Sequence, residues 1–358
     1  MIKKDTFTLD WVKHVNIEQG WNRKIEQFKN IEKAIMALKL LESLKVSGID
    51  FIFKGGTSLM LLFDKIYRLS VDIDLIIECD DKYMEKFDSI CSNNIFTHWK
   101  PQVRQSEDNK KTKHYCFYYK PFVDDTEESF VLLDVYEGKP LYSKTKDLPI
   151  VSSIINTDDK SVYVKVPTID CILADKLTAF APNTIGVKLS AEPGKRPKRV
   201  EILKQLFDVA NLFDRCSDIK TIRDTYIKIA NEEIDMAGLN YTYVDTLRDS
   251  FDFALIIGMD GKIDVEKYNV LSKGYNEFNK FVVDLSFNKF SAILAASKVA
   301  YLAKLISHNY DIIEKYDDKI DLRELVIKDA RYKDLSSYLY SSPEAYYYFV
   351  KALSIDED

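Results

Sequence analysis

Residues 53–77 read FKGGTSLMLLFDKIYRLSVDIDLII and carry the most informative pattern of the sequence. Gly55 and Gly56 follow a short apolar segment, and two aspartates separated by one residue begin the apolar segment at the other end. Residues two apart in a strand point to the same side of the sheet. We therefore expect a strand in which Asp72 and Asp74 present both carboxylates on one face.

Two ionised carboxylates so close together repel each other, and a bound divalent cation removes that cost. Magnesium favours a few carboxylates together with phosphate oxygens and water. The other interpretation of the aspartate pair is an edge strand with solvated acids. The glycine pair favours the metal, because glycine N–H groups between a strand and a helix approach a phosphate closely. Thr57 and Ser58 add hydroxyl donors there and are candidate helix caps.

Length and composition restrict the class of protein. A chain of 358 residues suggests two domains, and 46% hydrophobic residues are typical of a soluble globular protein. The net charge of −6 argues against non-specific coating of duplex DNA, although a local patch for RNA stays open. The five cysteines are widely spaced, and no apolar run is long enough to span a bilayer. We expect a cytoplasmic protein with no membrane partner.

Hydrophobic periodicity divides the chain into an α/β part, residues 1–165, and a helical part, residues 166–358. In the first part we expect strands at 50–53, 71–77, 114–119, 130–136 and 162–166, with helices at 22–46, 59–64 and 82–90. In the second part we expect helices at about 168–180, 200–213, 220–233, 243–257, 265–281 and 288–307.

The glycine pair and the aspartate pair together carry a family resemblance. The segment Lys54-Gly55-Gly56-Thr57-Ser58-Leu59, followed by Arg68-Leu69-Ser70-Val71-Asp72-Ile73-Asp74-Leu75, resembles the AbiEii-type nucleotidyltransferase toxins. These belong to the nucleotidyltransferase superfamily of DNA polymerase β and are the toxin halves of type IV toxin–antitoxin and abortive-infection systems. The resemblance implies an α+β fold: a polymerase β-like nucleotidyltransferase core, with a mixed sheet and flanking helices, followed by a helical C-terminal domain.

The resemblance also implies a third carboxylate on a later strand. Asp134, within Val131-Leu132-Leu133-Asp134-Val135-Tyr136, is the best match, and the alternative is an acid at a strand end. Asp124 and Asp125 are poorer candidates because they lie in an expected turn. The expected metal ligands are therefore Asp72, Asp74 and Asp134, with Mg²⁺ or Mn²⁺ as the ion.

Two further family motifs fall in the helical part. Leu173-Ala174-Asp175-Lys176-Leu177 matches a motif whose lysine binds the triphosphate, which implies that role for Lys176. Lys204-Gln205-Leu206-Phe207-Asp208-Val209 matches a second motif only in part, because Lys204 and Gln205 replace Arg and Asp. Asp208 carries over and could orient Lys176 or a nucleotide hydroxyl. A surface lysine and a helix-surface acid are the simpler interpretations.

Weaker signals remain open. The basic stretch 193–199 could contact RNA phosphates or be a solvated charge run, and the aromatic run 346–349 could stack bases or pack the last helix. The four histidines are scattered and form no grouping with a nucleophile. The candidate nucleotide-binding residues are Lys54, Gly55, Gly56, Thr57, Ser58, Arg68, Ser70 and Lys176; the candidate catalytic residues are Asp72, Asp74, Asp134, Lys176 and Asp208.

These residues predict a metal-dependent nucleotidyltransferase that uses a nucleoside triphosphate (NTP) as substrate. An acceptor hydroxyl attacks the α-phosphorus and pyrophosphate leaves. The resemblance implies the 3′ end of tRNA as the acceptor and a cognate antitoxin as a partner. Two alternatives remain: an enzyme that modifies a protein or a small molecule, and a non-catalytic nucleotide-binding module of the same fold. The intact set of carboxylates argues against the second.

Overall fold

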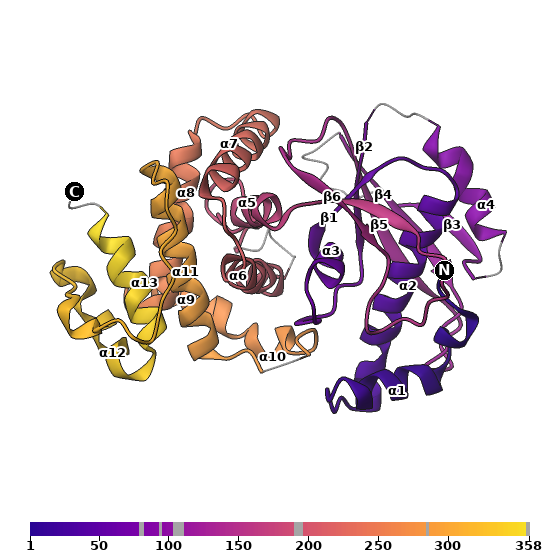
Figure 1. The fold of residues 1–358 in the computed structure, drawn as a ribbon, viewed down its shortest axis with the longest axis horizontal. Coiled ribbons are helices and arrows are strands. Elements are labelled where there is room, and N and C mark those ends of the chain that lie inside the picture. Colours follow the sequence, from indigo (N-terminus) through magenta and orange to yellow (C-terminus); the bar gives the residue numbers. More distant parts are fainter. Residues whose placement is uncertain (79–81, 93–94, 103–110, 190–195, 284–285, 356–358) are drawn as a thin grey trace. The chain divides into compact units, whose positions relative to one another are not determined.

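The chain folds into two compact units (Figure 1). The first contains Met1–Thr168 and Lys280–Ser286, and the second contains Ile169–Asn279 and Phe287–Asp358. The structure is a computed structural model that describes residues 1–78, 82–92, 95–102, 111–189, 196–283 and 286–355. Segment 280–286 therefore belongs to the first unit, although the helical pattern of the sequence placed it in the second.

The first unit is built on a seven-stranded mixed sheet with the order β3-β4-β5-β2-β1-β7-β6. Strand β2 is parallel to β5 and β1 is parallel to β7, and the other neighbours are antiparallel. The predicted α+β class, a mixed sheet with flanking helices, is confirmed. The strands are β1 (Ile52–Lys54), β2 (Ile73–Ile77), β3 (His98–Pro101), β4 (Thr112–Tyr119), β5 (Ser129–Glu137), β6 (Thr145–Pro149) and β7 (Tyr163–Pro167).

Strand β2, which follows the aspartate pair, is the central strand of this sheet and not an edge strand. Ile73 and Leu75 are buried, and the two-residue alternation puts Asp74 on the other side. The strand begins at Ile73, so Asp72 immediately precedes it instead of lying inside the predicted strand 71–77. An edge strand with solvated acids is therefore the wrong interpretation.

The two faces of the sheet differ in burial. Along β5, Val131, Leu133 and Val135 are completely buried, whereas Leu132 and Asp134 between them are only half-buried. On β4 the buried aromatic rings are packed by Phe87 and Phe96, with ring centroids 5.0 and 5.9 Å from that of Phe117. One face thus forms the core, and the other keeps partly accessible side chains.

Four α-helices accompany the sheet in the described part of the first unit: α1 (Leu9–Glu18), α2 (Phe28–Val46), α3 (Gly55–Leu62) and α4 (Phe87–Cys91). Helix α2 begins later than the predicted 22–46. A short 3-10 helix, Ile25–Gln27, precedes it, and before that Asn22 has a positive φ of 51° and Lys24 is extended. After α2, Gly48 has a φ of 80°, a conformation that suits glycine and ends the helix. Helix α1 and strands β3 and β6 were not predicted.

The predicted helix 265–281 is correct only in part. The chain forms α9 (Val265–Ser272) and α10 (Tyr275–Phe278) and then becomes extended. There, Leu69 N donates to Phe281 O at 2.8 Å and Val283 N donates to Tyr67 O at 3.0 Å. The buried Arg23 guanidinium donates to Lys280 O and Val282 O. These tertiary hydrogen bonds satisfy the backbone outside a helix and so override the local helical pattern.

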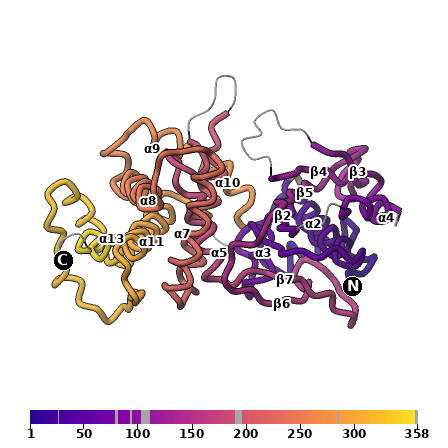
Figure 2. Tube along the Cα trace, turned by 90° about the horizontal axis from the view of Figure 1, so that it is seen from above, coloured from indigo at the N-terminus to yellow at the C-terminus, as the bar shows by residue number. Residues whose placement is uncertain are grey.

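The second unit is helical, and α11 (Lys289–Ser307) lies at its centre, in contact with α6, α8 and α13 (Figure 2). Helix α11 is long and apolar enough to cross a membrane, but 72% of its apolar window is buried inside the protein, as in a core helix.

Residues 346–349 are buried in α13, so they pack this helix and do not stack bases. The bounds are α5 (Ile169–Ala179), α6 (Arg199–Phe213), α7 (Ile219–Met236), α8 (Tyr243–Gly258), α12 (Tyr338–Ser341) and α13 (Pro343–Ser354).

Candidate active site

A row of four polar side chains crosses the middle of the sheet. Lys54 on β1 pairs with Asp74 on β2, Asp74 pairs with Asp134 on β5, and Asp134 pairs with His114 on β4. Residues directly opposite each other on neighbouring strands share a face of the sheet. The row therefore places the two carboxylates side by side on the partly accessible face, between a lysine and a histidine.

The glycine bend lies against this row. A Cβ atom added at Gly55 would be 2.0 Å from Asp74 Oδ2, and Gly55 has a φ of 77°. No L side chain fits at that distance, and the positive φ disfavours one as well. Glycine at position 55 is therefore what allows the Asp74 carboxylate to lie against the first turn of α3, whose N–H groups favour anions.

Gly56 likewise lies close to two predicted nucleotide-binding residues, Arg68 and Ser70. A Cβ at Gly56 would be 2.6 Å from Arg68 Nη2 and 2.8 Å from Ser70 Oγ. Arg68 is buried, with 7% of its surface exposed, and its Nη1 donates to Leu69 O at 3.3 Å. The structure thus brings Gly55, Gly56, Arg68, Ser70 and Asp74 together at the start of α3, where a guanidinium adds positive charge to the helix N-terminus.

Thr57 and Ser58 have a different place from the one that the sequence suggested. Both are completely buried inside α3, which begins at Gly55 and has no side-chain cap. The Thr57 hydroxyl donates to Asp72 O, and the Ser58 hydroxyl donates to Gly55 O at 2.8 Å. These hydroxyls therefore hold the glycine bend and the chain before β2 in place, and Thr57 connects the backbone of Asp72 to α3.

His114 is a site residue that the sequence did not predict. Its Nδ1 lies 2.7 Å from Asp134 Oδ1, and the exposed fractions of the two side chains are 14% and 20%. A ring N–H that donates to a carboxylate fixes the orientation of that carboxylate. The only signal available from the sequence was that both residues fall in expected strands, because the register between those strands is not written in the residues themselves.

The fit of a metal ion to this site depends on Asp74 and Asp134. Among the described residues, no group of three or more His, Cys, Asp or Glu side chains lies close enough to hold a metal ion. Magnesium, however, is commonly held by one or two carboxylates, with substrate phosphates and water completing its shell. The neighbouring pair of carboxylates beside an anion-favouring helix N-terminus has that chemistry.

The helical unit brings the other two predicted residues together. Lys176 Nζ on α5 lies 3.2 Å from Asp208 Oδ2 on α6. Asp208 is 1% exposed and the Lys176 side chain 9% exposed, so neither is the surface residue of the simpler interpretation. A buried charge requires a partner, and here each supplies the other.

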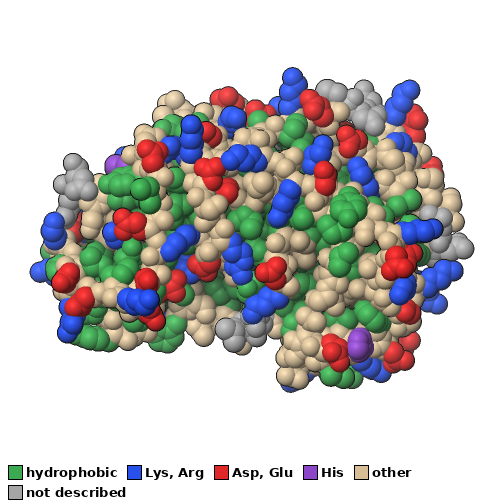
Figure 3. All heavy atoms as spheres, viewed as in Figure 1, with side chains coloured by type: hydrophobic (Ala, Val, Ile, Leu, Met, Phe, Trp, Pro, Cys, Tyr) green, Lys and Arg blue, Asp and Glu red, His purple; other side chains and the backbone are tan. Residues whose placement is uncertain are grey.

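The remaining predicted sites have fewer described contacts. Residues 193–195 of the basic stretch lie outside the described residues. At the end of that stretch, Arg199 forms an ion pair with Glu277. Figure 3 shows basic and acidic side chains interspersed over the visible face, in accordance with the mildly acidic composition.

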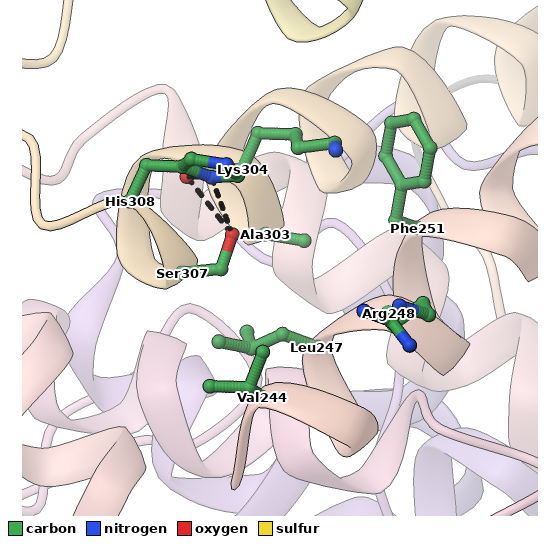
Figure 4. Close-up of a pocket in the computed structure, with 8 residues that line it drawn as sticks. All are labelled: Val244, Leu247, Arg248, Phe251, Ala303, Lys304, Ser307 and His308. Atoms are coloured by element: carbon green, nitrogen blue, oxygen red, sulfur yellow. Dashed lines mark hydrogen bonds between the residues drawn. The ribbon is translucent and has the colours of Figure 1, made fainter. Parts of the chain in front are cut away.

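The helical unit also contains a cavity of about 210 Å³ between α8 and α11 (Figure 4). Arg248 and Lys304 line it, and the Lys304 ammonium lies 4.5 Å from the centre of the Phe251 ring. Val244, Leu247 and Ala303 supply apolar walls. None of the residues predicted from the sequence lines this cavity, so it is separate from the candidate active site.

A mixed sheet with neighbouring carboxylates beside a glycine bend defines the class of protein as a nucleotidyltransferase. Residues 39–280 match the family described as "Nucleotidyl transferase AbiEii toxin, Type IV TA system", which is more than half of the chain. The chain therefore belongs to the AbiEii nucleotidyltransferase toxin family, as the sequence resemblance predicted. Membership implies an NTP substrate and a cognate antitoxin.

Two other comparisons add less. Among solved structures, the chain is similar to an antigenic nucleotidyltransferase-like protein from Paracoccidioides brasiliensis, with 14% sequence identity and a TM-score of 0.36. That match covers 58% of this chain and 91% of the other. No curated protein matches the chain.

Proposed function

We propose that this nucleotidyltransferase transfers a nucleoside monophosphate from an NTP to a hydroxyl at the 3′ end of tRNA, with Mg²⁺ or Mn²⁺ as cofactor. The observation that carries the proposal is the in-register pair Asp74 and Asp134 beside the close approach of Gly55 to Asp74. This arrangement combines a cation site with an anion site, which is what a metal-bound triphosphate requires.

In this proposal, the residues around the glycine bend bind the phosphates of the NTP. The N–H groups at the start of α3 and the Arg68 guanidinium bind the phosphates, and Gly55 and Gly56 keep that surface free of side chains. Lys54 and Ser70 flank the same surface. The hydroxyls of Thr57 and Ser58 hold the bend in shape.

The carboxylates of Asp74 and Asp134 would hold the metal ion. Asp72, which the family resemblance implied as a further ligand, does not form a group of three with them among the described residues. When bound, a divalent ion lowers the pKa of the acceptor hydroxyl and stabilises the charge of the leaving pyrophosphate. His114 holds the Asp134 carboxylate in one orientation through its Nδ1 contact.

Lys176 is proposed to bind the triphosphate, as its family motif implies, with Asp208 as the residue that positions it. Support comes from their ion pair, since a lysine held by a buried carboxylate is restrained to few conformations. The tRNA acceptor and a role in abortive infection and phage defence are further proposals that rest on the family. A cytoplasmic location accords with both NTP and tRNA as substrates.

The test is an incubation of the purified protein with each of the four labelled NTPs and total RNA, in magnesium and in chelator. We expect label on tRNA with at least one NTP, and no label in chelator or with the Asp74→Asn variant. A parallel incubation with lysate protein separates the alternatives. Label on protein alone would reject the RNA acceptor, and NTP binding without any labelled product would support a non-catalytic module.

A further inference from the structure

A second row of side chains crosses the same face of the sheet, farther from the carboxylates. His98 on β3 pairs with Tyr118 on β4, and Tyr118 pairs with Phe130 on β5. Tyr118 and His114 are four residues apart on β4, so the alternation puts both on one face. At about 3.3 Å per residue, the second row lies about 13 Å along the strands from the row that contains Asp134.

The three rings form a continuous aromatic surface. The His98 and Tyr118 rings are stacked, with centroids 4.4 Å apart and planes within 4° of parallel. The Tyr118 and Phe130 centroids are 5.7 Å apart. Strands β3, β4 and β5 lie side by side in Figure 1 and Figure 2, which makes the row a surface of the sheet itself.

This row differs from the aromatic rings that pack the core. On β4, Tyr115, Phe117 and Tyr119 are at most 4% exposed and lie on the opposite face. Phe130 is 38% exposed and the His98 side chain 37% exposed, although both are ring residues inside strands. Core packing therefore explains the rings of the opposite face and leaves this row unexplained.

Two lysines lie against the row in the described part of the chain. Lys100 Nζ lies 5.2 Å from the centre of the Tyr118 ring, and Lys33 Nζ lies 5.5 Å from that of Phe130. Among the described residues, Glu128 brings an acidic group to the row, with its carboxylate 3.6 Å from His98 Nδ1. Aromatic rings with flanking lysines are the combination by which a sheet face binds unpaired nucleotides.

We propose that this aromatic row, His98, Tyr118 and Phe130 with Lys33 and Lys100, binds single-stranded RNA by stacking two or three unpaired bases. The inference deepens and rests on the proposed function: the row would hold the strand whose terminal hydroxyl is modified at Asp74 and Asp134. Charge complementarity and the stacked rings favour single-stranded nucleic acid over duplex, whose bases are not free to stack.

The experiment measures binding alone, without NTP or metal, on the full chain. The probe is a fluorescein-labelled single-stranded RNA of about ten nucleotides, read by anisotropy, with the same sequence as a duplex for comparison. We expect the single strand to bind more tightly. Tyr118→Ala and Phe130→Ala should each weaken binding by about 10-fold or more, and Tyr118→Phe should keep wild-type affinity because it keeps the ring.

Two further variants keep the test independent of folding. Tyr163→Ala removes an exposed tyrosine of the same sheet outside the row and should not change binding. Lys100 is exposed, so Lys100→Gln should leave the fold intact while reducing the salt dependence of binding by about one phosphate contact. Unchanged affinity in the two ring variants, or an unchanged salt slope in Lys100→Gln, would overturn the proposal, as would a wild-type protein that binds no single strand.

Failure of the RNA-binding surface can be distinguished from failure of the proposed function. The Asp74→Asn variant should lose nucleotidyl transfer and keep RNA binding, because Asp74 lies outside the aromatic row. If the row binds RNA but no RNA is ever labelled, the proposed acceptor fails and the binding surface stands. If RNA is labelled equally well by wild type and by Tyr118→Ala with Phe130→Ala, the binding surface fails and the proposed function stands.

Discussion

The sequence motifs predicted two clusters of charged residues, the carboxylates on the sheet and the pair Lys176–Asp208 in the helical unit. The two clusters differ in solvent exposure. The Asp134 side chain on the sheet is 20% exposed, on a face that remains partly accessible. In the helical unit, Asp208 is 1% exposed and its partner Lys176 is also buried. The sheet cluster can therefore exchange water for a ligand at little cost, whereas the helical pair contributes to the fold whatever else it does.

Because of this difference in exposure, charge at the first cluster should matter for activity, and charge at the second cluster for stability. A carboxylate that faces a ligand can lose its charge with little effect on stability, but activity is lost with it. A carboxylate in a buried pair cannot lose its partner without leaving an uncompensated charge in the protein. Substitutions at the two clusters should therefore separate activity from stability.

The largest expected effect is that of Asp74→Asn on nucleotidyl transfer. The substitution keeps the size of the side chain and removes its charge, so we expect transfer to fall by about 10³-fold or more, with little change in thermal stability. The labelled-NTP assay and a thermal melt measure both. Asp147→Asn, at an exposed aspartate on β6 of the same sheet, is the matched control and should retain full activity. Comparable transfer by Asp74→Asn and Asp147→Asn would contradict the candidate site.

The second prediction concerns the buried pair. Lys176→Met removes the ammonium group that pairs with the buried Asp208 carboxylate and should lower the free energy of unfolding by about 3–5 kcal/mol. The double variant Lys176→Met, Asp208→Leu should recover most of that stability. Lys262→Met, at the exposed ion pair Lys262–Asp334, should cost less than about 1 kcal/mol. Denaturant unfolding measures all three.

The same double variant separates the two roles of Lys176. If the lysine binds the triphosphate, the restored protein should be stable and yet bind NTP weakly. A stable double variant with wild-type NTP affinity and transfer would assign Lys176 and Asp208 to the fold alone.

The third prediction tests the close approach of Gly55 to Asp74. Gly55→Ala must displace the Asp74 carboxylate, since the new Cβ would lie 2.0 Å from its Oδ2. A displacement of this order should reduce transfer by about 10²-fold. Gly238→Ala is a matched control, because Gly238 also has a positive φ, of 60°, but nothing within 4 Å of the added atom. It should show only the cost of the backbone conformation, about 1–2 kcal/mol, and no loss of transfer.

The sequence predicted the parts of the site that lie close together along the chain. Gly55, Asp72 and Asp74 belong to one short stretch, and the local periods of a strand and a helix were enough to relate them. Asp134 came from the family resemblance, which implied a third carboxylate on a later strand, and the structure pairs it with Asp74. Strand β3 was missed because its pairing with β4 determines it, and the extended segment 280–283 was missed because tertiary hydrogen bonds determine it. Helix α1 begins at a local cap, the Thr8 hydroxyl that accepts from Trp11 N, which the prediction did not use.

The role of His114 could not be predicted from the sequence. Its contact with Asp134 depends on the register of β4 against β5, which are joined by the connection 120–128. A connection of that length does not fix the register as a two-residue turn would. A shift by one residue would have put His114 on the opposite face from Asp134 and into the core.

The smallest expected effect is therefore that of His114, which acts only through Asp134. His114→Phe removes the donor to Asp134 Oδ1 and should reduce transfer by about 10-fold, at the lower end of the losses found when the hydrogen-bond partner of a metal ligand is removed. The loss should appear as a higher magnesium concentration for half-maximal transfer, because a loosely held carboxylate binds the ion less well. His114→Asn, whose amide can donate at a similar position, should recover most of the activity. An equal loss in both variants would mean that the ring packs the sheet and does not orient the carboxylate.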